Sequence, residues 1–595
     1  MASLFLSLVA TSQRHWRQRS AICVQITTRE VVDCPPSARY STLETIEGVH
    51  LTNSTIAAEL RPSTWSPLRH ATFRALWIAG LVSDFGAWMH QVGEAWLMTS
   101  LSPSPLMVAL LTSADSLAIF LFSLPAGALA DVFDRRRLAI LTQGWMLVAA
   151  LTLAVLSFEG AMTPWLLISL SFVMSIGAAV DAPVWQAIVP DLIPRDELPQ
   201  AVALGGVSIN IARAVAPALG GLIVAAIGPY AVFLLNAITF FYVIAVLARW
   251  RPASAKANLP PERLLGAVKR GLRYVRNSPE LLAVFFRTGV ALFASSCLLA
   301  LLPVLARREL SLGSTGYGLL YGCMGAGALL AVPLLPTLRA KLSEDSTLAA
   351  GSIVFAFVLL TLALLHNAWL AGGAILIGGV AWLTMLSSLN VGVQTATPSW
   401  VRARVLSIYM IVFQAAIALG GLAWGTLAER RSLRVAFLAA GAAMLVGTLA
   451  GRKWFRLSGR APDFSPSLHW PKPVLVCQPA AEDGPVLVTI DYRVPAENQR
   501  RFIRAVKRLE PLRRRGGAYQ WDLYRDPSKR DRFLETYVVD SWADHLRQHE
   551  RLTVEERNAE ARLRKLLLAG TSPVVTHLVE VDAETELRAE PPDQD

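Results

Sequence analysis

The chain has 595 residues, of which 53% are hydrophobic and only 17% are charged, and its formal net charge is +12. Its mean hydropathy is +0.43. So little charge excludes an ordinary soluble protein and is typical of a polytopic membrane protein. The Lys and Arg residues lie mainly in short turns, so the positive charge indicates membrane topology, and we expect no nucleic-acid partner.

Residues 1–60 differ from the rest of the chain, because they are polar and show no periodicity. The apolar stretch Met1–Ala10 precedes the basic residues, which is the reverse of the order in a signal peptide. We expect a disordered extension without a function, and a start of translation near Val49 would equally suit the membrane part.

Apolar segments follow one another from Arg69 to about Arg452. The stretch Ser346–Val401 contains no Asp, Glu, Lys or Arg. Because a transmembrane helix needs about 20 apolar residues to cross a hydrocarbon core of roughly 30 Å, this stretch holds two spans. The whole pattern predicts about twelve spans: 73–98, 104–128, 138–158, 163–184, 199–226, 230–249, 283–306, 315–338, 346–366, 369–390, 404–428 and 433–451.

A longer basic segment divides the predicted membrane part into two six-helix halves. Residues 61–250 form the first half, 251–280 a cytoplasmic linker and 281–453 the second half. Within the linker, Glu262–Arg276 has the spacing of an amphipathic helix. Positive charge favours the turns after even-numbered spans, which places both chain ends in the cytoplasm.

The composition changes again after the last predicted span. Residues 454–484 read as a Pro-rich linker, 485–582 as a soluble domain and 583–595 as an acidic tail. The soluble domain has the order strand, helix, strand, strand, helix, strand, which predicts an α+β ferredoxin-like sandwich. The predicted fold class is therefore an all-α polytopic membrane protein with a C-terminal α+β domain.

The turn between the second and third spans resembles the signature of major facilitator transporters. Gly127, Asp131, Arg135 and Arg136 match it, whereas Val132 and Asp134 replace a usual basic residue and a usual Gly. The resemblance implies that the Asp caps a neighbouring helix and that the basic pair contacts acids on adjacent helices. These contacts would hold the outward-facing state of a transporter with two six-helix halves.

The fifth span resembles the antiporter motif of the same superfamily. Pro217, Gly220 and Gly221 match it, but Ala216 stands where the motif has Gly. A missing backbone donor and small residues allow the helix to bend and to approach its neighbours closely. The motif favours export, although a structural kink without a role in coupling explains the same residues.

Three further blocks, Phe73–Trp77, Asn390–Trp400 and Ser541–Arg551, resemble one branch of the superfamily, the transmembrane secretion effectors related to the enterobactin exporter. The resemblance covers about Pro62 to Val581. It implies a bacterial inner-membrane efflux permease, whose partners are the lipid bilayer, protons and a small-molecule substrate. The soluble domain resembles antibiotic-biosynthesis monooxygenase domains, which implies a homodimer through this domain.

Three ionisable residues lie deep inside the predicted spans: Asp84, Asp115 and Arg213. At 1.5 Å per residue they lie about 16–21 Å from the cytoplasmic ends, near the midplane. Charges at this depth are costly and indicate function. One Arg neutralises only one carboxylate, so we expect an ion pair with Asp84 and a titrating Asp115, or the reverse. The alternative is a static polar cluster that ties helices together.

Several polar and aromatic residues are candidates for lining a substrate cavity. Asp84, Trp88 and Gln91 share one face of the first span, since their spacing is i, i+4, i+7. The full set is Asp84, Trp88, Gln91, Glu94, Gln186 and Gln394. Trp is also common at membrane interfaces, where it has no substrate role.

The sequence predicts neither a catalytic site nor a cofactor. It contains no GxxxxGK[ST] phosphate-binding loop, so ATP is not the expected energy source. His545 and His549 have a spacing that suits a metal, but no HExxH motif is present, so we expect a charged helix face or a subunit contact and no metal.

Two classes of function remain. The first is a proton-coupled exporter of small amphiphilic molecules such as a siderophore, antibiotic or drug, which is not an enzyme. The alternative is a membrane-tethered enzyme or sensor whose activity lies in the C-terminal domain.

Overall fold

The computed structural model describes residues 63, 65–194, 196–250, 271–457, 463–465, 467, 469–470, 479–480 and 482–580. The predicted N-terminal extension, the acidic tail and most of the amphipathic helix at 262–276 lie outside these residues.

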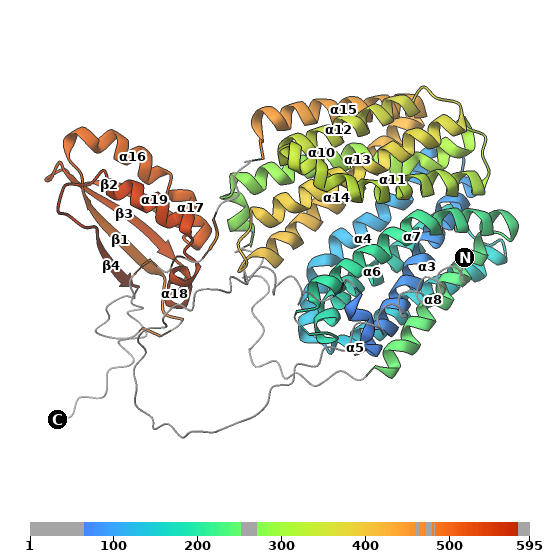
Figure 1. The fold of residues 1–595 in the computed structure, drawn as a ribbon, viewed down its shortest axis with the longest axis horizontal. Coiled ribbons are helices and arrows are strands. Elements are labelled where there is room, and N and C mark those ends of the chain that lie inside the picture. The colour runs from blue at the N-terminus through green and yellow to red at the C-terminus, as the bar shows by residue number, and fades with distance from the viewer. Residues whose placement is uncertain are drawn as a thin grey trace, which may run out of the picture. The chain divides into compact units, whose positions relative to one another are not determined.

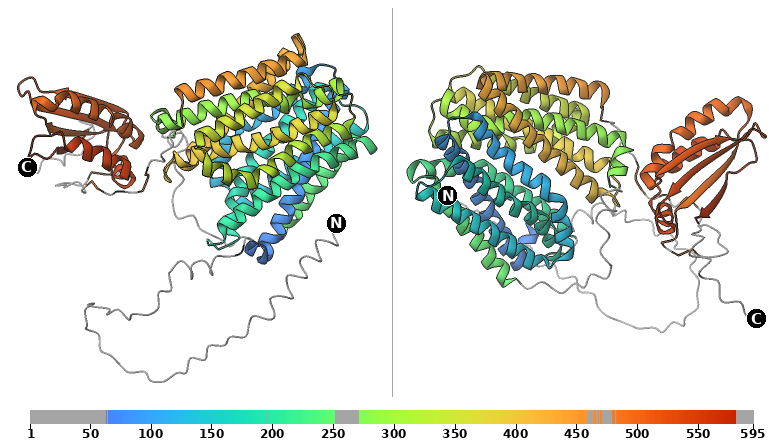
Figure 2. Two further views of the ribbon diagram at one scale, coloured as in Figure 1. Left: turned by 45° about the horizontal axis from the view of Figure 1, so that its top comes forward. Right: turned by 180° about the vertical axis from the view of Figure 1, so that it is seen from behind.

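Long helices make up the membrane part (Figures 1 and 2). In the described residues they are α3 (Ala71–Leu101), α4 (Pro105–Val132), α5 (Arg135–Phe158), α6 (Pro164–Ile188), α7 (Leu198–Ala226), α8 (Pro229–Arg249), α10 (Pro279–Val304), α11 (Ser314–Lys341), α12 (Glu344–Leu362), α13 (Ala368–Thr395), α14 (Arg402–Arg430) and α15 (Leu433–Trp454).

Local sequence signals start these helices. The Ser104, Thr163 and Asn367 side chains each accept a hydrogen bond from a backbone N–H of the following first turn. These caps satisfy donors that have no partner inside the helix. Gly228 lies in the turn between α7 and α8 with φ of 119°, a conformation that glycine adopts readily.

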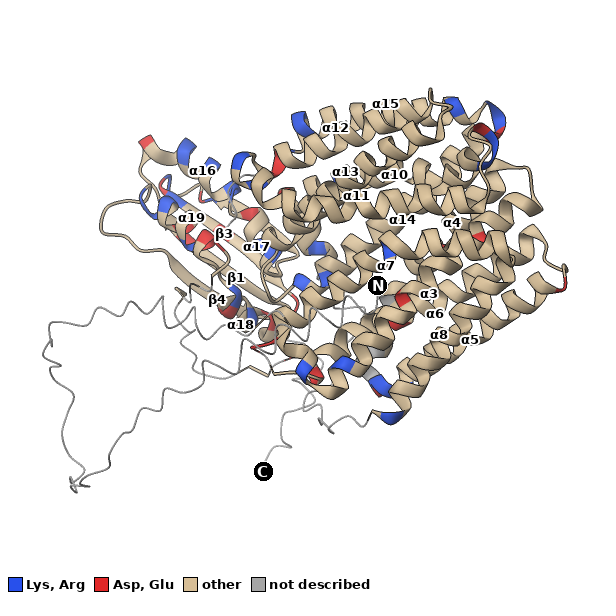
Figure 3. Cartoon of the chain, turned by 45° about the vertical axis from the view of Figure 1, so that its right-hand side comes forward, with Lys and Arg blue, Asp and Glu red and all other residues tan. Residues whose placement is uncertain are grey.

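By length and composition, eleven helices of the described part could cross a membrane. The remaining long helix is α3, whose polar residues include Asp84, His90 and Glu94. Figure 3 shows Lys, Arg, Asp and Glu mostly near helix ends, with long uncharged stretches between them. Large apolar side chains such as Leu141 and Val148 are exposed on the bundle, as a lipid-facing surface requires.

The helices form two halves, α3–α8 and α10–α15, which meet chiefly where α7 packs on α11 and α4 packs on α14. Small residues permit the close approach. A Cβ added to Gly221 would lie 2.4 Å from the backbone oxygen of Ser314, and one added to Gly425 would lie 2.5 Å from the Ala109 Cβ. The two halves therefore touch almost backbone to backbone.

Polar contacts between the halves gather at the end that carries the α3–α4 and α10–α11 turns. Arg307 donates to the hydroxyls of Thr99 and Ser100 at 2.9 and 2.8 Å. Ser104 donates to Glu429 at 2.9 Å. These hydrogen bonds join the two halves at this end.

The soluble domain contains a four-stranded antiparallel sheet of order β2-β3-β1-β4. Its strands are β1 (Val486–Arg493), β2 (Gln520–Arg525), β3 (Arg532–Val539) and β4 (Val574–Val579). Its helices are α16 (Gln499–Lys507), α17 (Glu510–Gly516), α18 (Trp542–Arg551) and α19 (Val554–Arg564). In β1 and β3, buried and partly exposed residues alternate, so one face of each strand lines an apolar core.

Candidate functional site

Asp84, Trp88, Gln91 and Arg213 lie in one polar–aromatic cluster. Asp84 accepts a hydrogen bond from Ser208 on α7 at 3.0 Å. The guanidinium carbon of Arg213 lies 5.1 Å from the centre of the Trp88 ring. In the described part of the chain no ion pair within 4.0 Å joins Asp84 to Arg213, so the stacked ring is the direct neighbour of the cation.

Tyr321 on α11 brings the second half of the protein into this cluster. Its hydroxyl donates to the Gln91 side-chain oxygen at 3.1 Å, and its ring meets the Trp88 ring edge-on at 5.9 Å. Tyr321 also stacks with Tyr317, which in turn stacks with Trp96 of α3. The cluster therefore spans the boundary between the two halves, where a major facilitator transporter binds its substrate.

Glu94 lies in a second, more deeply buried cluster one to three turns along α3. Glu94 is 3% exposed and His90 is 1% exposed. One Glu94 carboxylate oxygen contacts both the His90 Nε2 atom at 2.9 Å and the Ser171 hydroxyl at 2.5 Å. Glu94 was predicted as a cavity residue and His90 was not, although their i, i+4 spacing within an apolar segment was an available signal.

Asp115 lies on α4 beside this cluster. It accepts a hydrogen bond from Ser175 on α6 at 2.8 Å, and it lies close enough to Glu94 for their charges to interact. Two carboxyl groups and one imidazole thus gather inside the first half. The contacts of Ser171 and Ser175 with these carboxyl groups could not be predicted from sequence spacing, because α6 is distant from α3 and α4 in the chain.

The other two glutamines of the predicted cavity, Gln186 and Gln394, are exposed. Gln186 lies on α6 and Gln394 on α13, where Gln394 donates to Asn390 at 2.6 Å. Among the described residues, no hydrogen bond joins either side chain to the clusters on α3.

Arg135 and Arg136 of the signature turn bind helix ends. Arg135 donates to the Ala187 carbonyl oxygen at 3.1 Å and to Asp191 at 2.7 Å. Arg136 donates to the last carbonyls of α8, those of Leu247 at 2.8 Å and Ala248 at 2.6 Å. A cation at a helix C-terminus is favourable because it satisfies orphan carbonyls. The Asp131 side chain lies outside the described atoms, and an added Cβ on Gly127 would meet open space.

Pro217, Gly220 and Gly221 lie at contacts between helices. A Cβ on Gly220 would lie 2.9 Å from the Met89 Cα atom on α3, whereas Gly221 faces α11. The carbonyl oxygen of Pro217 lies 2.4 Å from where a Cβ on Gly318 would be. The motif therefore provides close helix packing on two sides of α7.

Arg287 lies near the start of α10 and is buried in an ion pair. It is 5% exposed and donates to Asp345 of α12 at 2.7 Å. Asp345 also contacts Arg452 at 3.7 Å, so this ion-pair group ties α10, α12 and α15 together.

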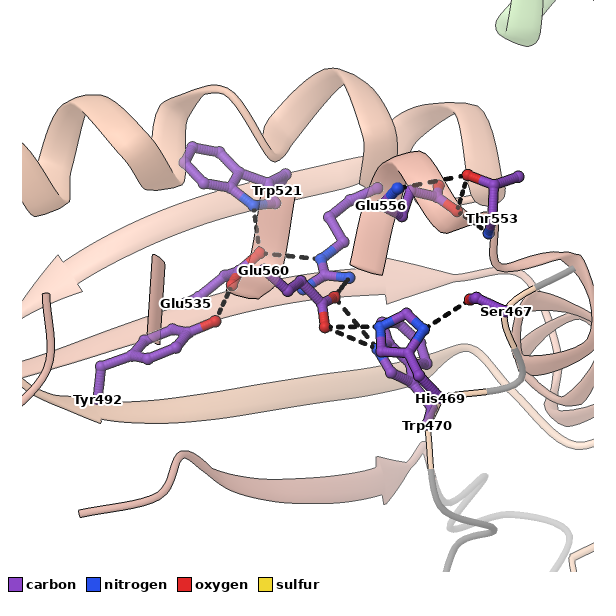
Figure 4. Close-up of polar contacts among 10 residues, drawn as sticks. Ser467, His469, Trp470, Tyr492, Trp521, Glu535, Thr553, Glu556 and Glu560 are labelled. Carbon is purple, nitrogen blue, oxygen red and sulfur yellow. Dashed lines mark hydrogen bonds and ion pairs between the residues drawn. The ribbon is translucent and has the colours of Figure 1, made fainter. Parts of the chain in front are cut away.

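A buried charged network fills the core of the soluble domain (Figure 4). Glu535 is 0% exposed and accepts hydrogen bonds from Tyr492, Trp521 and Arg513 at 2.7, 2.9 and 3.2 Å. Arg513 also donates to Glu560 at 2.8 Å. Each charge is paired and hydrogen-bonded, so the network is the framework of the domain.

Two residues of the linker that precedes the domain complete this network. His469 and Trp470 contact Glu560 at 3.0 and 3.1 Å (Figure 4). The Trp470 ring also lies 4.9 Å from the guanidinium carbon of Arg513. Trp521 thus donates a hydrogen bond to Glu535, and its indole N–H belongs to this structural network.

The long helices and their division into two packed halves define a membrane transporter of the major facilitator type. The chain matches the model of the transmembrane secretion effector family over residues 62–585, and it belongs to this family. The match extends across the soluble domain.

Relatives and solved structures agree with this assignment. The chain is 26% identical to the staphyloferrin A transporter of Staphylococcus aureus over 55% of its length and 82% of the relative. It is 25% identical to the enterobactin exporter EntS of Escherichia coli over 57% of its length and 81% of the relative. A bacterial homologue of the lysosomal transporter Spinster, solved inward-facing, shares the fold with a TM-score of 0.55 and 14% identity, over 66% of this chain and 98% of that one.

Proposed function

We propose that this protein exports small amphiphilic molecules of the siderophore class across a bacterial inner membrane by proton-coupled alternating access. The observation that carries the proposal is the cluster of Trp88, Gln91 and Arg213 with Tyr321, because it joins residues of both halves. Aromatic rings and one cation suit an aromatic, anionic ligand. Two relatives that are named for siderophores support this substrate class.

Proton coupling is assigned to the buried carboxyl groups of Glu94 and Asp115, with Asp84 as the group nearest to the substrate cluster. Ionisable side chains inside a membrane protein are proton-relay candidates by default. His90 and Ser171 contact Glu94, and Ser175 donates to Asp115, so both carboxyls are hydrogen-bonded inside the first half.

Orientation follows from the predicted cytoplasmic termini. The end joined by Arg307 and Ser104 then faces outward, and the opposite end, which carries Arg135 and Arg136, faces the cytoplasm. We infer an inward-facing state, because Arg135 and Arg136 contact residues of the first half and do not latch the two halves together. Opening the outer end requires breaking these exposed polar contacts, which are weak individually.

We further propose that the soluble domain is a ferredoxin-like regulatory or dimerisation module. Its strand order and its alternation of strands and helices support that fold. The alternative, an enzyme anchored by the helices, is less favoured because the family model describes a secretion effector over both parts.

Transport into inverted membrane vesicles tests the proposal. With a pH gradient imposed, we expect uptake of a catecholate siderophore that stops when an uncoupler is added, and no uptake of a fluorescent cationic dye. A variant truncated after Arg456 should keep part of the siderophore uptake. If the siderophore is not taken up, the substrate class is wrong; if truncation removes all uptake, the alternative in which the C-terminal domain carries the activity gains support.

A further inference from the structure

Three histidines of the soluble domain converge outside the network of Glu535. His545 and His549 lie one turn apart on α18, and His577 lies on the edge strand β4. One nitrogen atom of each imidazole lies within 4.8 Å of the other two. The His545 ring centre lies 4.7 Å from that of His577 and 4.9 Å from that of His549.

The spacing of these nitrogens suits a tetrahedral metal ion. Zn–N bonds of about 2.0–2.1 Å place neighbouring ligand atoms of a tetrahedron about 3.3–3.4 Å apart. The Nε2 atoms of His545 and His549 are 3.3 Å apart. Small rotations of the His577 ring would bring the third nitrogen to the same spacing, because its nitrogen is already within 4.8 Å.

A hydrogen bond between the two imidazoles of α18 is the metal-free explanation of the short distance. This hydrogen bond, however, leaves at least one nitrogen atom of the three imidazoles without a hydrogen-bond partner in the described part of the chain. His545 is 0% exposed, and its Nδ1 atom has no hydrogen-bond partner among the described residues. Among the described residues, His577 has no hydrogen bond to the other two imidazoles, although its ring packs against that of His545. A shared cation on the Nε2 atoms of His545 and His549 explains why the third ring converges on them.

The elements around the cluster fix two of its rings. Ser541 caps α18 by accepting a hydrogen bond from the Asp544 backbone, which sets where the helix begins. The Trp542 ring then packs against His545 at 5.3 Å and meets His577 edge-on at 6.1 Å. His549 and His577 are only partly buried, so an ion can enter from their side.

We propose that His545, His549 and His577 bind one divalent transition-metal ion of the Zn²⁺ type. Three imidazoles suit Zn²⁺, Cu²⁺, Ni²⁺ and Fe²⁺. The group contains no fourth His, Cys, Asp or Glu ligand from the described residues, so one coordination position is left for water or another small ligand. The side-chain oxygen of Gln548, which is buried without a partner, lies on the same helix.

Metal titration of the full-length protein, purified without a histidine tag and stripped with a chelator, tests this site. We expect one Zn²⁺ per chain by elemental analysis and competition with a chromophoric chelator. His549→Gln and His577→Gln should each weaken binding more than tenfold. His366→Gln is the matched control, because its side chain is 71% exposed in the membrane part, and it should bind Zn²⁺ like the unmodified protein.

Co²⁺ provides a second readout that does not depend on stability. The unmodified protein should give the strong visible absorption of tetrahedral Co²⁺, and both variants should lose it. The variants should unfold at the same temperature as the stripped unmodified protein, and Zn²⁺ should raise that temperature only when the three histidines are intact. Less than a tenth of an equivalent of Zn²⁺ bound, or equal binding by the variants, overturns the proposal.

Discussion

Arg213 rests on the face of Trp88, with its guanidinium carbon 5.1 Å from the ring centre. Its Nε atom is buried and has no hydrogen-bond partner among the described residues. Asp84, the nearest predicted counter-ion, is instead hydrogen-bonded to Ser208. A cation held by an aromatic ring keeps N–H donors that a negatively charged ligand can use.

Replacement of Arg213 by Lys tests this use of the guanidinium. An ammonium group keeps the charge but loses the planar stacking and the forked donors. A desolvated cation–π contact is worth about 2 kcal/mol, so its loss should weaken siderophore uptake at low substrate concentration by up to about thirtyfold. The measurement is initial uptake in inverted vesicles. Arg434→Lys, at an exposed position of α15, is the control, and equal loss in both variants would rule out a specific role.

Neutral replacements of Glu94 and Asp115 test the proton path. Glu94→Gln and Asp115→Asn keep size and polarity but remove the titrating group. We expect the gradient-driven part of uptake to fall to background, while exchange of internal for external substrate continues. Asp84→Asn extends the test to the third carboxyl group.

Glu159→Gln is the control for these carboxyl variants, because Glu159 is exposed in the turn after α5. It should leave gradient-driven uptake unchanged. If Asp84→Asn, Glu94→Gln and Asp115→Asn all transport normally with the gradient, the clusters are static and only tie helices together.

The periodicity of the sequence predicted the structural features that depend only on residues close together in the chain. Apolar runs gave the membrane helices, and the helical period placed Asp84, Trp88 and Gln91 on one face of α3. The Ser104 side chain caps the start of α4, next to the boundary that the apolar run predicted. These features need only neighbouring residues, so a single sequence contains them.

Contacts between distant helices were not predictable in the same way. Tyr321 reaches Gln91 across 230 positions, and Ser171 reaches Glu94 across 77. Such contacts depend on how each helix is rotated and packed against its neighbours. The periodicity of a single helix does not determine this. The same reason applies to His577, since only the pairing of β4 with β1 brings it to α18.

The α7–α11 contact gives a prediction for stability. A Cβ on Gly221 would lie 2.4 Å from the Ser314 backbone oxygen, so Gly221→Ala forces two backbones apart. Overpacking of this kind costs about 1–3 kcal/mol, and we expect a lower unfolding temperature in detergent and slower transport.

Gly205→Ala on the same helix is the matched control for that substitution. Nothing lies within 4 Å of its added Cβ, so it should be neutral, or stabilising by up to about 1 kcal/mol through helix propensity. Equal unfolding temperatures for the two variants would show that α7 and α11 separate easily.

Glu560 predicts how the soluble domain responds to acid. Burial opposes its ionisation, but Arg513 and the hydrogen bonds from His469 and Trp470 outweigh this and lower its pKa from 4.5 to about 2. A pKa that is depressed in the folded state contributes stability above pH 4.5, and this contribution is lost as the pH falls from 4.5 to about 2. The difference corresponds to about 3 kcal/mol.

Replacement of Glu560 by Gln should therefore weaken the domain at pH 7 and flatten its pH dependence between 4.5 and 2. The measurement is amide-exchange protection of β3 in the full-length protein, corrected for the pH dependence of chemical exchange. Glu497→Gln, an exposed residue before α16, should leave the profile unchanged. A Glu560→Gln profile that runs parallel to that of the unmodified protein would mean that other groups cause the acid response, since the depressed carboxyl would then contribute nothing to it.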